Sequence, residues 1–547
     1  MKHFSIIALA ALMLTACGPK TDHIRILATS DTHGMFYPYS YALLQENPTS
    51  MCNVASIVKE RKDDCTLLVE AGDIIQDNSS ELFLEDDVHP MIAAMNQIGY
   101  DVWITGNHEY NYGFKVLNKI IPQCKAKFLA GNVYSPEGKQ LGNDYVIIKK
   151  KGVKIGFIGM VTPNIVNWDK LHLQGWTVTN PVEETAELVK ELRPKVDLLI
   201  AVEHMGLENE YNTPGSGARE LAMTCPELDL IVSAHFHQGF TDTIVNGVRI
   251  VQNQGQCRTM TQVDFKKTAN GWETTGELIN VADYAPDSAC LAVLQPFHER
   301  ALAEATKVIG RVEGGDLIPA DRFPGVCNAY LGDHPWPDLV AEAMKHYADA
   351  DIAVAFAVPT KATILDGQEV TKADGAVIYK FANTLYKLRM TGKQLKTYME
   401  WTAGYYQTYK PGQPLRFNRD FASFNFDMFT GVDYEINVSK PAGQRIENLC
   451  WSETKVPVED TDTFTIAISN YRAGTQMLNP GVVFPEGEDL PVILETDIRS
   501  DIGNVRAIIC HYIEHELKGV ITPRCNHNWR LTGLPADFTV EPDGWGH

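Results

Sequence analysis

Short apolar runs alternate with helical stretches through the first half of the chain. The runs are rich in branched residues and lie at 24–28, 67–69, 102–104, 153–158, 198–202 and 228–232. Uninterrupted apolar runs of this length are typical of strands that are buried on both faces. Because helical stretches separate them, the pattern predicts a layered α/β domain.

The pattern changes near residue 290. A charged, alanine-containing stretch at 291–309 predicts a linker helix. A second, α+β domain is expected at 310–547, with helices at 338–347 and 392–402 and strands at 432–438 and 464–468. This division leaves 17–290 for the first domain. It agrees with the length of the chain, because 547 residues are too many for one hydrophobic core.

The N-terminal segment has the features of an export signal. Lys2 is followed by a short apolar run at 6–14, and the small Ala16 precedes Cys17. This order resembles a bacterial lipobox, which predicts that residues 1–16 are removed and that Cys17 is lipidated. The protein would then be exported and held on the membrane of the cell envelope by a lipid anchor. The alternative is an ordinary cleaved signal in which Cys17 occurs by chance.

Composition limits the kinds of partner. The formal net charge of -21 argues against binding to a nucleic-acid polymer. An enzyme that acts on anions would therefore need a local positive field, since distant surface charges are screened beyond about 8 Å at physiological salt. Of the eleven cysteines, Cys52 and Cys65 are a pair that could form a disulfide, and free buried thiols are an equal alternative.

Polar clusters directly follow five of the predicted strands. They are Ser30-Asp31-Thr32-His33-Gly34, Ala71-Gly72-Asp73, Gly106-Asn107-His108-Glu109, Glu203-His204-Met205-Gly206 and Ala234-His235-Phe236-His237. Singly, each has a structural explanation, such as a helix cap or a turn. Because the carboxyl ends of strands in an open α/β sheet form the ligand crevice, the five clusters are expected to converge. Their combination predicts a site for two metal ions.

The charge balance of such a site suits a phosphate ester. Two divalent cations outweigh the two carboxylates of Asp31 and Asp73, which leaves a positive surplus for an incoming dianion. Mixed carboxylate, amide and imidazole ligands favour Zn, Mn, Fe or Co over Ca or Mg.

These motifs resemble the calcineurin-type metallophosphoesterases, and specifically the 5′-nucleotidase family, over nearly the whole mature chain. The resemblance implies a four-layer β-sandwich flanked by helices, followed by an α+β substrate-binding domain. It also implies two ligand sets that share Asp73: Asp31, His33, Asp73 and His237 for one metal, and Asp73, Asn107, His204 and His235 for the other. His108 would contact the phosphate and stabilise the transition state, although a structural role is the alternative.

One position departs from many family members. Asn111 stands where an aspartate often pairs with the catalytic histidine, so it can orient His108 without supplying a charge. The form with asparagine is similar to the 2′,3′-cyclic-nucleotide 2′-phosphodiesterase/3′-nucleotidase branch. Second-domain blocks agree with that branch, namely Asn383-Thr384-Leu385, Asn425-Phe426-Asp427, Gly431-Val432-Asp433-Tyr434 and Asn470-Tyr471-Arg472-Ala473. The arginine typical of 5′-nucleotidases is missing from 355–361.

The resemblance further implies that two aromatic rings hold the nucleobase. Phe426 and Tyr471 are the candidates, with Asn383 as a further substrate-binding residue. The alternative is that both rings are core residues, as aromatic side chains near strands usually are.

The sequence therefore predicts an exported hydrolase that releases phosphate from nucleotides. The 5′-nucleotidase and cyclic-phosphodiesterase/3′-nucleotidase activities both remain open. Two alternative hypotheses remain for the function. One is a lipoprotein that captures nucleotides or metals without turnover, and the other is a sugar- or lipid-phosphate phosphatase that uses the same metals.

Overall fold

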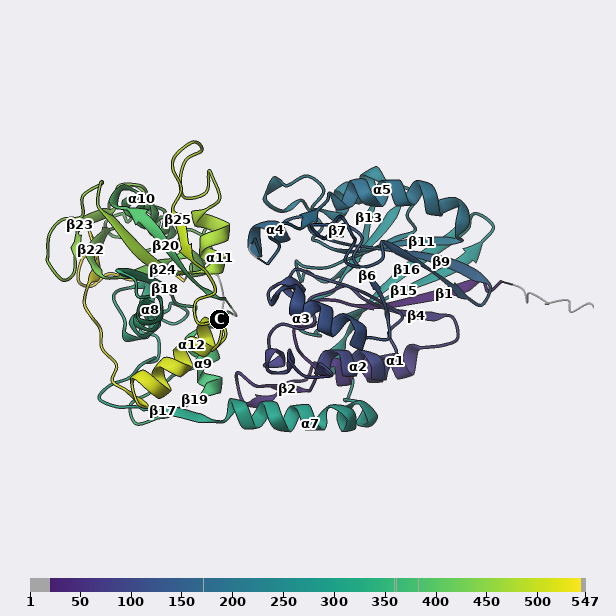
Figure 1. Cartoon of the computed structure of the whole chain (residues 1–547), viewed down its shortest axis with the longest axis horizontal. Coiled ribbons are helices and arrows are strands. Elements are labelled where there is room, and N and C mark those ends of the chain that lie inside the picture. Colours follow the sequence, from purple (N-terminus) through teal and green to yellow (C-terminus); the bar gives the residue numbers. More distant parts are fainter. Residues whose placement is uncertain (1–19, 171, 359, 361, 382, 543–547) are drawn as a thin grey trace, which may run out of the picture.

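The computed structural model describes residues 20–170, 172–358, 360, 362–381 and 383–542. Two bodies lie side by side and are joined along one edge by helix α7 (Ser288–Ala305) (Figure 1). None of the helices among the described residues combines the length and apolar character needed to span a bilayer. The proposed signal at 1–16 and Cys17 lie outside the described residues.

Two six-stranded sheets form the centre of the first domain. The first has the order β16-β15-β1-β4-β5-β6, and the second has the order β13-β14-β12-β11-β9-β8. The strands of the first sheet are β16 (Gly271–Asn280), β15 (Thr259–Thr268), β1 (His23–Thr29), β4 (Thr66–Glu70), β5 (Val102–Ile104) and β6 (Lys127–Leu129). Those of the second are β13 (Phe240–Val245), β14 (Val248–Gln252), β12 (Leu230–Ser233), β11 (Leu198–His204), β9 (Val153–Val161) and β8 (Tyr145–Lys150).

Apolar side chains of both sheets share one core, which places the sheets face to face. Ile26 and Leu67 of the first sheet belong to the same buried cluster as Phe157 and Ile200 of the second. Helices cover the outer faces: α1 (Met51–Arg61), α2 (Pro90–Ile98) and α7 on one side, and α5 (Pro181–Leu192) and α6 (Ala218–Thr224) on the other. The expected four-layer arrangement is confirmed.

The six predicted strands are all present, as β1, β4, β5, β9, β11 and β12. Strands β1 and β4 are parallel with Thr29 opposite Glu70, and β11 and β12 are parallel with Glu203 opposite Ser233. The residues that follow these strands therefore leave the sheets at the same edge, which is the arrangement that the strand-end clusters predicted.

The second domain is built on a five-stranded sheet. Its strands, in order, are β21 (Asp427–Thr430), β18 (Ile352–Phe356), β24 (Thr463–Ser469), β20 (Leu385–Thr391) and β25 (Val492–Glu495). The helices include α8 (Pro335–Ala348), α9 (Lys372–Ile378), α10 (Gly392–Thr402) and α12 (Val505–His511). Two small sheets complete the domain: β19 (Glu369–Thr371), β17 (Val308–Val312) and β26 (Val520–Ile521), and β23 (Ile446–Trp451), β22 (Val432–Asn437) and β27 (Trp529–Thr532).

The helix expected at 291–309 is present but shifted toward the N-terminus. The side chain of Asp287 caps its first turn, accepting from the backbone N–H groups of Ala289 at 3.0 Å and Cys290 at 2.9 Å. The helix ends at Ala305, and Val308 already pairs with Thr371 in a strand of the second domain.

Cys52 and Cys65 are not joined by a disulfide. The buried Cys52 thiol instead interacts with Cys290 of α7, and this hydrogen bond together with burial raises its pKa. The thiol therefore takes part in packing α1 against α7.

The domains approach each other next to the strand-end clusters. A short helix, α11 (Asn470–Arg472), continues into a π-helical turn at Ala473–Met477, which contacts α4 (Ile165–Trp168) of the first domain. A Cβ atom on Gly474 would lie 2.9 Å from the carbonyl oxygen of Asn167, so the lack of a side chain permits this close approach.

Candidate metal centre

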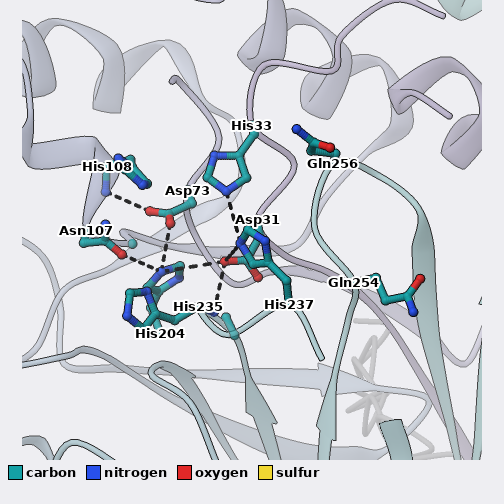
Figure 2. A network of polar contacts seen from close by, with 12 residues as sticks. Asp31, His33, Asp73, Asn107, His108, His204, His235, His237, Gln254 and Gln256 are labelled. Carbon is teal, nitrogen blue, oxygen red and sulfur yellow. Dashed lines mark hydrogen bonds and ion pairs between the residues drawn. The ribbon is translucent and has the colours of Figure 1, made fainter. Parts of the chain in front are cut away.

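The side chains at the ends of β1, β4, β5, β11 and β12 converge on one point. Figure 2 shows the predicted ligands turned toward one another, with Asp31 and Asp73 among the histidines. Three groups have ligand atoms within 4.8 Å of one another: Asp31, His33 and His237; His33, Asp73 and His108; and Asp73, His204 and His235. Asn107 joins the last group through its Oδ1 atom, 3.1 Å from Nε2 of His204.

The backbone bends sharply where these residues leave their strands. Asp31, His33, Asp73, His235 and His237 all have positive φ, between 45° and 72°. Left-handed conformations at residues other than glycine are uncommon and cost about 1–3 kcal/mol each, and they concentrate at functional sites. The surrounding structure must therefore hold these loops in place.

Glu109 holds two of the loops together. Its carboxylate is fully buried and accepts backbone hydrogen bonds from Asp73 at 2.8 Å, Ile74 at 2.7 Å and Gly106 at 2.5 Å. Burial raises the pKa of Glu109, as does the charge of Asp73, and the backbone donors oppose both effects. The sequence showed Glu109 beside the predicted ligands but indicated no role for it. Its role here is to fix the loop after β4 to the loop after β5.

Gly106 allows the closest approach between these loops. A Cβ atom at this position would lie 2.1 Å from Oδ1 of Asp73 and 2.5 Å from Cε1 of His204. Any larger side chain would therefore displace two predicted ligands.

Hydrogen bonds on the outer side of the histidines orient their inner nitrogens. Nδ1 of His204 donates to the carbonyl oxygen of Ala71 at 2.7 Å, so Nε2 faces Asp73 and Asn107. Nδ1 of His33 lies 3.0 Å from Oε1 of Gln76, which leaves its Nε2 toward the centre. Such outer partners fix the tautomer of metal-ligating histidines. Gln76 was not predicted from the sequence.

The centre is electrostatically suited to cations. Burial lowers the pKa of His204, but Asp73 and Asp31 oppose it and raise the value to about 10. Oδ2 of Asp31 is buried and has no hydrogen-bond partner among the described residues, although a buried carboxylate oxygen normally requires one. Two carboxylates, an amide oxygen and inward imidazole nitrogens therefore fit transition-metal ions.

His108 occupies the rim of the centre. Its backbone N–H donates to Oδ1 of Asp73 at 2.8 Å, and its ring nitrogen Nδ1 lies 2.6 Å from Oδ1 of Asn111. The ring packs edge-to-face against His33 with the centroids 5.3 Å apart. The structure therefore places Asn111 in contact with the His108 ring.

Comparison with known proteins agrees with this arrangement. Residues 24–239 match the calcineurin-like phosphoesterase family, and residues 308–479 match the C-terminal domain of 5′-nucleotidases. The chain contains a calcineurin-like phosphoesterase domain followed by a 5′-nucleotidase C-terminal domain. The family resemblance read from the motifs is therefore confirmed.

Relatives match the phosphoesterase along nearly all of its length. The 2′,3′-cyclic-nucleotide 2′-phosphodiesterase/3′-nucleotidase of Haemophilus influenzae is 27% identical, and the match covers 98% of this chain and 92% of that protein. The trifunctional nucleotide phosphoesterase YfkN of Bacillus subtilis is 26% identical over 93% of this chain, which spans only 39% of that longer protein. A 5′-nucleotidase precursor from Thermus thermophilus shares the fold, with a TM-score of 0.62, 18% identity and coverage of 94% of this chain and 100% of that one.

In the C-terminal domain of the phosphoesterase, the expectation for Phe426 is wrong. Its side chain is fully buried and is surrounded by the rings of Tyr330, Tyr405, Tyr406 and Trp529, with centroids 5.2 to 6.0 Å away. No face of this ring is open to a nucleobase. The alternative interpretation, that Phe426 is a core residue, is correct.

The motif blocks around Phe426 and Tyr471 are joined by a buried ion pair. Nε of Arg472 lies 2.8 Å from Oδ2 of Asp427, and both side chains are almost completely buried. Arg472 also donates to Oδ1 of Asn425 at 2.5 Å, and the hydroxyl of Tyr398 donates to Asp427 at 2.5 Å. These blocks therefore hold α11 against β21.

Tyr471 itself is only partly buried, and its helix α11 leads into the turn that contacts α4 of the first domain. It interacts electrostatically with Glu210, whose Oε2 atom is 3.2 Å from Nε2 of the predicted ligand His235. Asn383 belongs to a neighbouring segment, because Thr384 and Asn470 exchange hydrogen bonds of 2.9 and 3.0 Å. The structure thus brings the segments of Tyr471 and Asn383 together, and the turn that follows Tyr471 contacts α4 of the first domain.

Proposed function

We propose that the phosphoesterase hydrolyses phosphate monoesters and cyclic phosphodiesters of nucleotides with two divalent metal ions. The observation that carries this proposal is the convergence of the strand-end ligands around Asp73. The names of the matched relatives, which act on 2′,3′-cyclic nucleotides, 3′-nucleotides and 5′-nucleotides, support the substrate class.

We assign the ligands to two sets that share the Asp73 carboxylate. Asp31, His33 and His237 complete one set, and Asn107, His204 and His235 complete the other. When bound, two such ions polarise the phosphoryl oxygens and make a water molecule acidic enough to supply hydroxide near neutral pH. Zn, Mn, Fe or Co suits these ligands.

The protein's own groups orient the substrate. Because Nδ1 of His108 is turned toward Asn111, its Nε2 atom is available to a phosphate oxygen next to the metal centre. A hydrogen bond to a developing negative charge is worth more in such a partly desolvated site than in water. With Nδ1–H donating to Asn111, His108 contacts the phosphoryl group through Nε2, and it donates there when both ring nitrogens carry hydrogen.

Tyr471 and Asn383 form the base-binding side in this proposal. The partly exposed ring of Tyr471 would provide a face for stacking any nucleobase, and the amide of Asn383 lies on the adjoining segment. Two rings were candidates for stacking on the nucleobase. Because Phe426 lies in the core, Tyr471 is the one that remains.

Among nucleotides, the proposal favours 2′,3′-cyclic and 3′-nucleotides over 5′-nucleotides. Asn111 and the absence of an arginine at 355–361 both agree with the branch to which the Haemophilus influenzae relative belongs. The test is a comparison of kcat/KM for 2′,3′-cyclic AMP, 3′-AMP, 5′-AMP, a sugar phosphate and an aryl phosphate, with Mn or Zn added. Turnover of 5′-AMP alone would contradict the preference. Bound metal without turnover of any of these esters would contradict the enzyme.

We also propose that the enzyme is exported and lipid-anchored through Cys17. A signal-like segment in front of a lipobox-like sequence supports this, and one matched structure is that of a precursor. Mass spectrometry of the N-terminal peptide from membranes is the test. An unmodified peptide that still begins at Met1 would contradict it.

A further inference from the structure

Asp169 lies next to Asn111 and supplies the negative charge that an asparagine lacks. Nδ2 of Asn111 lies 3.2 Å from Oδ1 and 3.1 Å from Oδ2 of Asp169. Asp169 comes directly after α4, far from the strand-end clusters in sequence, and its side chain is only 3% exposed. A carboxylate therefore lies behind the His108–Asn111 pair, on the side away from the metal centre.

The chemistry of the three groups allows one arrangement of hydrogen bonds. An ionised carboxylate accepts but does not donate, so the amide group facing Asp169 must be the NH₂ of Asn111. Oδ1 of Asn111 then faces His108, at 2.6 Å from Nδ1. An amide oxygen also only accepts, so Nδ1 of His108 must carry hydrogen, and Nε2 is the atom that faces the phosphate.

We propose that Asp169 is a positioning residue that acts on His108 through Asn111. It fixes the orientation of the amide, and thereby the tautomer and ring position of His108. Its negative charge also polarises the amide, which strengthens the hydrogen bond that Oδ1 of Asn111 accepts from Nδ1 of His108. The inference rests on the proposed hydrolase function, in which His108 contacts the phosphoryl group.

The surroundings hold Asp169 in this role. Its backbone N–H donates to the carbonyl of Ile165 at 2.9 Å, and its carbonyl accepts from Leu173 at 2.9 Å, so both sides of the residue are fixed. Nδ1 of His172 lies 3.6 Å from Oδ1 of Asp169 and balances part of its charge. In the second domain, burial raises the pKa of Tyr386, and the charges of Asp497 and Asp169 add to this. Asp169 is therefore placed where α4 meets the C-terminal domain.

A charge swap tests the proposal. Asp169→Asn keeps the size of the side chain but removes the charge and lets the amide of Asn111 turn. We expect kcat to fall by about 10- to 100-fold, by analogy with the outer hydrogen-bond partners of metal-ligating histidines, while KM and metal content stay unchanged. Asn111→Asp alone brings two carboxylates together and is expected to lower kcat as well. The double variant Asn111→Asp/Asp169→Asn restores one amide and one carboxylate in reversed order, and it should recover most of the lost kcat.

The matched control is Asp287→Asn, at the cap of α7, where asparagine caps a helix as well as aspartate does. Its kcat should equal that of the wild type. Wild-type kcat in Asp169→Asn, or a double variant no better than the worse single variant, would overturn the proposal. These results differ from a failure of the proposed function, in which the metal-loaded wild type would hydrolyse no phosphate ester.

Discussion

The strand-end loops of the first domain and the aromatic segments of the second were both candidate sites, and they behave differently. In the first domain the predicted polar residues converge as expected. In the second, Phe426 is part of the core, and the blocks around it are held by the Arg472–Asp427 pair. The sheet fixes where each parallel strand ends, so the positions of the polar residues that follow these strands are strongly restricted. An aromatic residue next to a strand can pack in a hydrophobic core or lie at a binding surface, so its position along the chain does not determine its role.

Removal of the carboxylate shared by the two proposed ligand sets should have the largest effect. Asp73→Ala deletes the carboxylate that faces both ligand sets, at 3.1 Å from Nε2 of His204. Because bound metal contributes several kcal/mol to stabilising the transition state, we expect kcat/KM for an aryl phosphate to fall by at least about 10³-fold. Metal analysis of the folded variant should show less bound metal. Normal turnover with a full metal complement would contradict the site.

The sequence was sufficient to predict that the proposed ligands converge, but not to find the groups that hold them in place. Glu109, Gln76 and Asp169 each act by contacting a residue distant in sequence, so no local spacing marks them. Asp169 follows a helix of four residues, Ile165–Trp168, which is too short to show a periodic pattern. Phe426 was misjudged because an aromatic residue beside a strand suits a hydrophobic core as well as a binding surface, and the sequence alone does not distinguish the two.

Removal of the Phe426 ring should affect stability rather than substrate binding. Phe426→Ala removes a fully buried ring and should lower the free energy of unfolding by about 3–5 kcal/mol. Since the ring does not face the substrate, the ratio of KM for a nucleotide to KM for an aryl phosphate should stay at the wild-type value in the folded fraction. Thermal unfolding and parallel kinetics check both expectations. A rise in the KM for the nucleotide but not for the aryl phosphate would contradict the core assignment and indicate that Phe426 contacts the substrate.

Tyr471 should show the reverse pattern. Tyr471→Ala is expected to weaken nucleotide binding by about 1–3 kcal/mol, the value of one base–aromatic stack. The KM for an aryl phosphate should not change, because that substrate has no base. Tyr471→Phe keeps the ring and is the matched control, with a nucleotide KM close to that of the wild type. An equal change for both substrates in Tyr471→Ala would mean that the ring only packs between the domains.

The smallest expected effect lies behind the ligands. Gln76→Leu removes the oxygen that lies 3.0 Å from Nδ1 of His33, so the imidazole loses the partner that fixes its tautomer. Metal affinity should fall by about 10-fold, at the lower end of the effect of such partners. The measurement is the metal concentration that restores half of the activity after chelation. Gln76→Glu retains an acceptor oxygen at this position and should need no more metal than the wild type does. If Gln76→Leu also reactivates at the wild-type concentration, the orientation of His33 is set by its metal and its loop alone, and the outer hydrogen bond is not part of the site.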